Sequence, residues 1–186
     1  MRIVFLGPPG SGKGTQAQRL QEELEIAHLS TGEMLRDADH AGTPLGREAA
    51  RHMQAGQLVP DDVVVGVVAD RLSEKDCERG CLFDGFPRTV PQAEALDKML
   101  AERKIPLNLV LALDVPTERL VDRLLARGRM DDNRETIHER FRQYDRLTEP
   151  LLDYYRRRGI LRMIDGEGTP DEVFSRIRRA VDTAIR

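Results

Sequence analysis

The sequence contains no tryptophan, two cysteines and four lysines, so that 25 of its 29 basic residues are arginine. Its formal net charge of −3 lacks the basic excess expected of a protein that binds nucleic acid or an anionic membrane surface. No apolar stretch approaches the roughly 20 residues that a membrane-spanning helix needs, and the apolar run at 3–6 is too short for the core of a signal peptide. We therefore expect a protein without nucleic-acid or membrane partners.

The two cysteines, Cys77 and Cys81, are separated by three residues. This spacing fits neither a redox pair nor the usual zinc site, so we predict free thiols in a reducing cytoplasm and no zinc. The length of 186 residues is typical of one domain, and 40% hydrophobic with 33% charged residues suits a single buried core. The sequence thus predicts one compact cytoplasmic domain.

Short apolar runs alternate along the chain with longer segments of helical periodicity, which predicts an α/β protein with a mainly parallel sheet. Strands are expected at 2–6, 27–29, 81–84, 107–114 and 160–164, and helices at 13–24, 32–40, 44–55, 61–72, 89–103, 116–127, 133–158 and 171–185. Pro150 should interrupt the helix 133–158 at Glu149. The aromatic residues Phe141, Tyr144 and Tyr155 of this helix are expected in the core rather than in a binding site.

The segment between the second and third expected strands is unusually long. Its roughly fifty residues exceed what one crossover helix requires. It contains three expected helices, with turn signals at 42–44 and 56–60. Part of this segment is therefore expected to form a helical subdomain that stands on the sheet.

Residues 7–16, GPPGSGKGTQ, connect the first expected strand to the first expected helix. The glycines let the backbone turn tightly, so that several N–H groups point at a phosphate chain at the positive end of the helix dipole. Lys13 can reach the β- and γ-phosphates as a mobile positive charge. Gly14 stands where general phosphate loops carry a magnesium-binding Ser or Thr, and Thr15 follows it. In this respect the loop resembles that of the nucleoside monophosphate kinases.

Three charged residues lie at the ends of other expected elements, where they suit a polyphosphate site. Asp84 ends an apolar strand beside the phosphate loop, and a carboxylate there can order water around magnesium. Arg36 and Arg88 each follow a turn, so that their forked guanidinium groups can clamp a monophosphate from two sides. A single arginine in this arginine-rich chain would be weak evidence without the surrounding motifs.

A second group of arginines follows the fourth expected strand. Arg123 and Arg127 are four residues apart and therefore share one face of a helix. Arg129 follows a glycine, and Arg140 lies on the next expected helix. Two interpretations are open for this segment: the arginines neutralise phosphate charge, or they form a solvated basic face paired with nearby acids. The acids in question are Asp122, Asp131 and Asp132.

Five segments together resemble adenylate kinase over nearly the whole chain: GPPGSGKGTQ at 7–16, LSTGEMLR at 29–36, QAGQLVPDDVV at 54–64, FDGFPRTVPQA at 83–93 and DVPTERLVDRLLARGR at 114–129. The resemblance implies a three-layer P-loop kinase fold, with helices on both faces of a five-stranded parallel sheet. It implies one domain with a core at 1–29, 60–126 and 134–186, a helical arm that binds the monophosphate at 30–59, and a short lid at 127–133. That lid is too short for the zinc knot of some relatives.

The resemblance also implies a reaction, the reversible magnesium-dependent transfer of the γ-phosphoryl group of ATP to AMP, giving two ADP. The ATP site that it implies consists of Gly10, Ser11, Gly12, Lys13, Gly14, Thr15, Arg127 and Gly168. The AMP site that it implies consists of Thr31, Arg36, Gln57, Leu58, Val59, Gly85, Phe86, Pro87, Arg88, Gln92, Arg129 and Arg140. The catalytic residues that it implies are Lys13, Arg88, Arg123, Arg129 and Arg140. Asp84 would hold Mg²⁺ through water. Glu33 replaces the aspartate usual in the family, and its longer side chain should preserve a water-mediated contact with the metal.

Three other functions remain open at this point. One is an ATPase or a repair accessory function, which would release phosphate without AMP. A UMP/CMP kinase shares the phosphate loop and the short lid, although it usually differs around Thr31 and 90–92, where this chain keeps the adenylate pattern. A non-catalytic adenine nucleotide-binding module should show damage at Lys13, Asp84 or the arginines, and none is visible. The four histidines, at 28, 40, 52 and 138, are expected to be structural or exposed, and the family default is a monomer.

Overall fold

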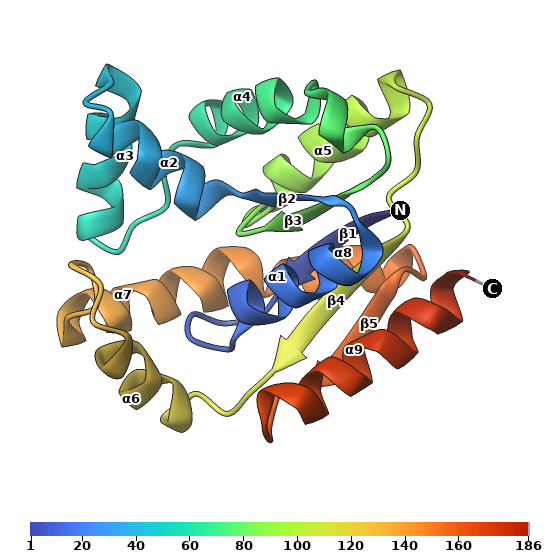
Figure 1. Ribbon diagram of the computed structural model, residues 1–186. Coiled ribbons are helices and arrows are strands. Elements are labelled where there is room, and N and C mark those ends of the chain that lie inside the picture. Colours follow the sequence, from blue (N-terminus) through green and yellow to red (C-terminus); the bar gives the residue numbers. More distant parts are fainter. Residues whose placement is uncertain (186) are drawn as a thin grey trace.

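The computed structural model of the protein describes residues 1–185, so that the last residue of the expected core segment 134–186 lies outside the described part of the chain. Its centre is a parallel sheet of five strands: β1 (Arg2–Leu6), β2 (Ala27–Ser30), β3 (Cys81–Asp84), β4 (Leu109–Asp114) and β5 (Leu161–Asp165). The strands lie in the order β2-β3-β1-β4-β5 (Figure 1). The predicted strands are confirmed, with ends that move by at most two residues.

Helices cover both faces of the sheet and make three layers, as predicted (Figure 1). One face packs against α4 (Asp61–Leu72), α5 (Val90–Glu102) and α8 (Pro150–Arg157). The other face packs against α1 (Lys13–Leu24) and α9 (Pro170–Ile185). Alternate residues of β1 point into the two cores: Val4 belongs to the first and Phe5 to the second. This double burial explains why the central strands are almost wholly apolar.

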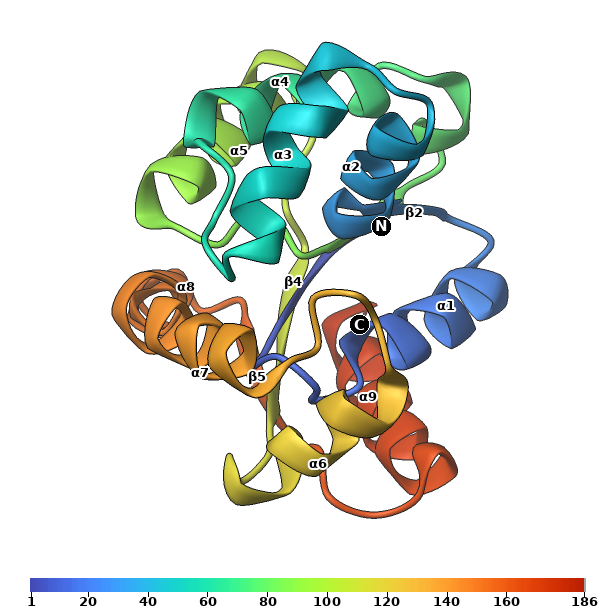
Figure 2. The same ribbon diagram turned by 90° about the vertical axis from the view of Figure 1, so that its left-hand side faces the viewer.

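Two pairs of helices project from the sheet at the carboxyl ends of the strands. The pair α2 (Thr31–His40) and α3 (Pro44–Gln54) follows β2 and occupies the expected arm. The pair α6 (Glu118–Arg127) and α7 (Arg134–Gln143) follows β4, and a short connection at 128–133 joins its members. Figure 2 shows the first pair facing the second across the end of the sheet. The precise borders of arm, lid and core stay a prediction.

The structure divides the expected helix 133–158 into three segments. After α7 the chain forms a π-helical segment, Tyr144–Thr148, before α8 begins at Pro150. Pro150 is the first residue of α8, a position where its missing N–H costs nothing, and this confirms the predicted interruption at Glu149. The wider π turn changes the direction of the side chains that follow it, because the 3.6-residue repeat no longer applies.

Candidate active site

A cavity of about 490 Å³ lies between the two projecting helix pairs and the phosphate loop. It opens at the carboxyl ends of β1, β2 and β3, where a parallel sheet usually binds its ligand. All of the predicted site residues line it except Ser11, Phe86 and Gly168. The structure therefore brings together segments that are more than a hundred residues apart in the sequence.

The three exceptions have other neighbours. Ser11 is buried in the phosphate loop, where its hydroxyl lies 3.4 Å from the Nζ of Lys13. Phe86 is fully buried and packs on Phe83, with 6.4 Å between the ring centroids. Gly168 precedes α9 and lies next to the side chain of Glu172. A Cβ at this glycine would lie 2.6 Å from the Glu172 carboxylate. None of the three lines the cavity, so their predicted contacts with nucleotides stay predictions.

The phosphate loop joins β1 to α1, as the sequence predicts. Gly12 immediately precedes α1 with a φ of 93°, a conformation that favours glycine. Lys13 curls back over the loop, and its Nζ donates to the carbonyl oxygens of Gly7 at 2.7 Å and Pro8 at 2.9 Å. Burial lowers the pKa of Lys13 to about 8, although the Asp84 carboxylate opposes the change. The lysine is thus held close to the loop that would receive a phosphate chain.

Asp84 ends β3 beside this lysine. Burial alone would raise the pKa of Asp84, but the nearby His28 imidazole and the charges of Lys13 and Arg88 outweigh it and hold the pKa below its usual range. The distance from the Oδ2 of Asp84 to the Nε2 of His28 is 3.6 Å. A Cβ at Gly14 would lie 3.5 Å from the same Oδ2, so the glycine keeps the space in front of the carboxylate open. His28, expected to be structural or exposed, is half-buried behind the site.

Arg88 and Arg36 face the cavity from the segment after β3 and from α2. The Nε of Arg88 donates to the carbonyl oxygen of Gly85 at 2.8 Å, and the Thr31 hydroxyl donates to the same oxygen at 2.9 Å. Burial lowers the pKa of Arg88, with Asp84 opposing it, and burial lowers that of Arg36, with Glu33 opposing it. Both guanidinium groups thus stand in surroundings that favour a negatively charged ligand.

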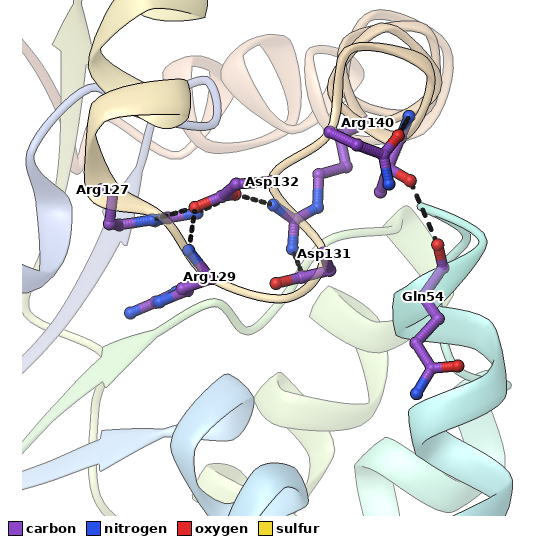
Figure 3. A network of polar contacts seen from close by, with 8 residues as sticks. Gln54, Arg127, Arg129, Asp131, Asp132 and Arg140 are labelled. Carbon is purple, nitrogen blue, oxygen red and sulfur yellow. Dashed lines mark hydrogen bonds and ion pairs between the residues drawn. The ribbon is translucent and has the colours of Figure 1, made fainter.

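Arg127 and Arg140 are held by two buried acids of the lid segment (Figure 3). Asp132 accepts hydrogen bonds from Arg127 at 2.7 and 2.8 Å and from Arg140 at 3.0 Å. Asp131 accepts a further hydrogen bond from Arg140. These arginines therefore pair with buried acids, as the second interpretation expects, and they also line the cavity. That they neutralise phosphate charge stays a prediction.

Arg140 has several other arginines near it. Its pKa is lowered to about 10, mainly by burial and in addition by repulsion from Arg127, Arg88, Arg129 and Arg36. Arg123 and Arg129 also line the cavity, and both are exposed. Opposite them, Glu33 lines the cavity from α2 and is exposed as well. The positive residues thus come from both sides of the cleft and converge on it.

Several residues of the site were not predicted from the sequence. Tyr144, expected in the core, is half-buried and lines the cavity. Thr148, in the same segment, donates its hydroxyl hydrogen to the carbonyl oxygen of Arg88 at 2.8 Å. Asp61 binds the side chain of Gln92, with 2.7 Å between Oδ1 and Nε2. Of these three residues, only Asp61 belongs to a motif named in the sequence, LVPDD at 58–62. Nothing in that motif predicts a contact with Gln92.

The arm also contacts α7 directly. The hydroxyl of Thr136 donates to the carbonyl oxygen of Gln54, the last residue of α3, at 3.1 Å (Figure 3). Gly56 has a φ of 71°, and a Cβ there would lie 2.8 Å from the carbonyl oxygen of Thr136. The two projecting helix pairs therefore meet at one edge of the cavity, with glycine at the closest approach.

Comparison with known proteins agrees with this geometry. A family model described as adenylate kinase matches residues 5–160. The adenylate kinase of Leptospira biflexa is 50% identical over 184 residues, which cover 97% of this chain and 99% of its own length. The adenylate kinase of Thermus thermophilus is 50% identical over 183 residues, which cover 96% of each chain. The adenylate kinase of Thermodesulfovibrio yellowstonii is 49% identical over an alignment of 208 positions, which covers 95% of this chain and 97% of that protein. The protein belongs to the adenylate kinase family of nucleoside monophosphate kinases.

Proposed function

We propose that this protein transfers the γ-phosphoryl group of ATP reversibly to AMP, giving two ADP, and so balances the adenine nucleotides of the cell. The observation that carries the proposal is that two phosphate-binding groups open into one cavity. The phosphate loop with Lys13 forms one side, and Arg36 with Arg88 forms another. A donor and an acceptor phosphate bound there would face each other in a space lined by positive charge.

The reaction requires little covalent help from the protein. An oxygen of the AMP phosphate forms a bond to the γ-phosphorus as the bond to the bridging oxygen of ATP breaks, and the departing electrons stay on ADP. That attacking oxygen is already anionic near neutral pH, so no general base is needed. In agreement, no histidine is among the described residues that line the cavity. Lys13, Arg88, Arg123, Arg129 and Arg140 would then act by positioning the phosphates and neutralising their charge.

The residues present suit Mg²⁺ delivered with ATP. Within residues 1–185 no group of three or more His, Cys, Asp or Glu is placed to hold a metal ion. Mg²⁺ commonly keeps several waters and binds through one or two carboxylates together with substrate phosphates, and Asp84 and Glu33 line the cavity where such contacts would form. When bound, the metal would supply neutralising charge to the phosphate chain. The open space in front of Asp84, beside Gly14, supports water-mediated contact.

The two nucleotide sites can be assigned to opposite parts of the cavity. We assign the AMP side to the predicted residues of the arm and of 85–92 that line the cavity, and the ATP side to the phosphate loop and Arg127. Closure of the arm and lid over the nucleotides would exclude water, which could otherwise accept the phosphoryl group.

We propose that the protein acts as a cytoplasmic monomer on ATP, AMP and ADP. No described helix is long and apolar enough to cross a membrane, and Cys77 and Cys81 are free.

A coupled assay of ADP formation from Mg²⁺, ATP and AMP tests the proposal. Wild-type protein should form ADP, and Lys13→Met should remove most of that activity. Arg88→Ala should lower kcat/KM for AMP by about 100-fold, the scale reported for removal of one transition-state hydrogen-bond donor. Arg142→Ala is the matched control, because that arginine is exposed on α7 and pairs with Glu139. A loss below about tenfold at Arg88 would remove this residue from the proposed site.

A panel of acceptors separates this function from its nearest rival. AMP, UMP, CMP and GMP at equal concentration should be phosphorylated with a clear preference for AMP. A preference for UMP or CMP would identify a pyrimidine nucleotide kinase instead. Phosphate release without any acceptor would indicate an ATPase.

A further inference from the structure

The side-chain amide of Gln92 is held at both ends by the protein itself. Gln92 lies in the first turn of α5 and is only 1% exposed, yet it lines the cavity. Its Oε1 accepts a hydrogen bond from the backbone N–H of Arg88 at 2.7 Å, and its Nε2 donates one to the Oδ1 of Asp61 at 2.7 Å. An amide has two donor hydrogens and two acceptor lone pairs. One of each is therefore used within the protein, and one of each remains.

Asp61 is itself fixed in place. It is the first residue of α4, and its second carboxylate oxygen accepts a hydrogen bond from the Thr89 hydroxyl at 2.8 Å. The same hydroxyl accepts from the backbone N–H of Gln92 at 3.2 Å and so caps α5. The carboxylate thus connects the first turns of two helices, where a negative charge is favourable. This closed set of hydrogen bonds leaves the amide little freedom to rotate.

The partners of the amide also determine its direction. A carboxylate can only accept hydrogen bonds, and a backbone N–H can only donate one. If the amide were turned over, oxygen would face oxygen at Asp61 and N–H would face N–H at Arg88, and both contacts would become repulsive. We propose that Asp61 is a specificity-determining residue that acts through Gln92: by fixing the direction of the amide, it makes the site select an adenine ring over a 6-oxopurine ring.

The chemistry of the bases explains this selection. Adenine presents an acceptor, N1, beside a donor, the 6-amino group. Hypoxanthine and guanine present the reverse order, a donor at N1 and an acceptor at O6. An amide fixed in one direction can pair with the first order and opposes the second, whereas an amide free to turn over can pair with both. The inference rests on the proposed function, because it requires the base of the acceptor nucleotide to meet Gln92.

Asp61→Asn tests the inference, because asparagine keeps the size of aspartate and can either donate or accept. AMP and IMP are the acceptors to compare, since they differ only at the 6-position and N1. The ratio of kcat/KM for AMP to that for IMP should fall about tenfold, and the fall should be partial because the Arg88 N–H still favours the original direction. CMP presents the same order of groups as AMP, so its rate relative to AMP should stay unchanged.

Asp62→Asn is the matched control. Asp62 is the next residue of α4, is exposed, and contributes the same charge to the first helical turn. Its replacement should leave the ratio of AMP to IMP within about twofold of wild type. If Asp61→Asn does not fold, Thr89→Val releases the second oxygen of Asp61 and should lower the ratio in the same direction, with Thr89→Ser as its hydroxyl-retaining control.

The outcomes separate the inference from the proposed function. If Gln92→Ala leaves KM for AMP unchanged while the wild type forms ADP, the base lies elsewhere and the proposed AMP site fails. If Gln92→Ala raises that KM but Asp61→Asn leaves the ratio of AMP to IMP unchanged, the inference alone is overturned. Equal losses with AMP and IMP in Asp61→Asn would show a merely structural role and would also overturn it.

Discussion

Asp132 binds Arg127 through both carboxylate oxygens, with 2.8 Å from Nε to Oδ2 and 2.7 Å from Nη2 to Oδ1. The side chain of Asp132 is fully buried and also accepts from Arg140. An acid without solvent contact thus orients two arginines that line the cavity. The lid segment is short, and this carboxylate gives its arginines a defined direction before any phosphate arrives.

Asp132→Asn should therefore lower kcat/KM for ATP with AMP by about 10- to 100-fold, the range found when a supporting contact of an active-site group is lost. An asparagine carries no charge and offers one oxygen, so it cannot bind the Arg127 guanidinium at both ends. Steady-state kinetics measure the loss. Asp122→Asn, on exposed α6 surface, is the control and should change kcat/KM less than twofold. Equal effects of the two substitutions would contradict an orienting role for Asp132.

Gly56 should tolerate no side chain. Gly56→Ala places a methyl group 2.8 Å from the carbonyl oxygen of Thr136 and keeps a φ of 71°, which costs an alanine about 1–2 kcal/mol. We expect a lower midpoint of thermal unfolding and a higher KM for AMP, because the arm must move away from α7. Calorimetry and AMP titrations measure the two effects.

Gly66→Ala provides the opposite control. Gly66 lies inside α4, and a Cβ there would meet nothing within 4 Å. Alanine in a helix interior is favoured over glycine by about 0.5–1 kcal/mol, so this variant should unfold at a higher temperature. If Gly56→Ala were as stable as Gly66→Ala, the close contact between the arm and α7 would be wrong.

The pKa of Lys13 predicts a pH dependence. Because burial lowers this pKa to about 8, the free protein loses the positive charge of Lys13 as pH rises through that value. The kcat/KM for ATP, which reports on the free protein, should therefore fall above pH 8. A bound phosphate chain raises the pKa of the lysine, so kcat at saturating nucleotide should stay level to a higher pH. A kcat/KM that increases through pH 8 would contradict this assignment.

The two cysteines should be unreactive in the folded protein. Burial raises the pKa of Cys77 to about 11 and that of Cys81 to about 12, so both are thiols rather than thiolates near neutral pH. A colourless aromatic disulfide reagent at pH 8 should titrate no thiol rapidly in the native protein and two after unfolding in guanidinium chloride. Rapid reaction of one native thiol would show that the segment around α4 and β3 opens easily.

The sequence predicted the sheet and the phosphate loop because both depend on local patterns. Buried parallel strands are recognised by apolar runs such as 109–113, and the loop by its glycine spacing before a helix. The resemblance to a family then supplied candidate residues that lie on separate elements, and the structure brings nearly all of them to one cavity. Their individual roles stay predictions until the variants are measured.

Other features could not be predicted because they depend on contacts between distant segments. The π-helical turn at Tyr144 changes which residues face the cavity, and helical periodicity assumes that no such turn exists. The hydrogen bond between Asp61 and Gln92 joins two helix starts that are thirty-one residues apart. The contact of Gln54 with Thr136 spans eighty-two residues. Residue type and spacing carry no signal for such pairs.

The crowded arginines of the cleft make the protein's stability depend on its substrates. Burial lowers the pKa of Arg36, Arg129 and Arg140, and the charges of neighbouring arginines lower it further, which means that folding brings like charges together against their repulsion. A nucleotide therefore acts on the folded chain as a polyvalent counter-ion. At a free concentration 100 times its Kd, it would stabilise the folded state by about 2.7 kcal/mol. As the nucleotide concentration falls, the free energy of unfolding should therefore fall with it.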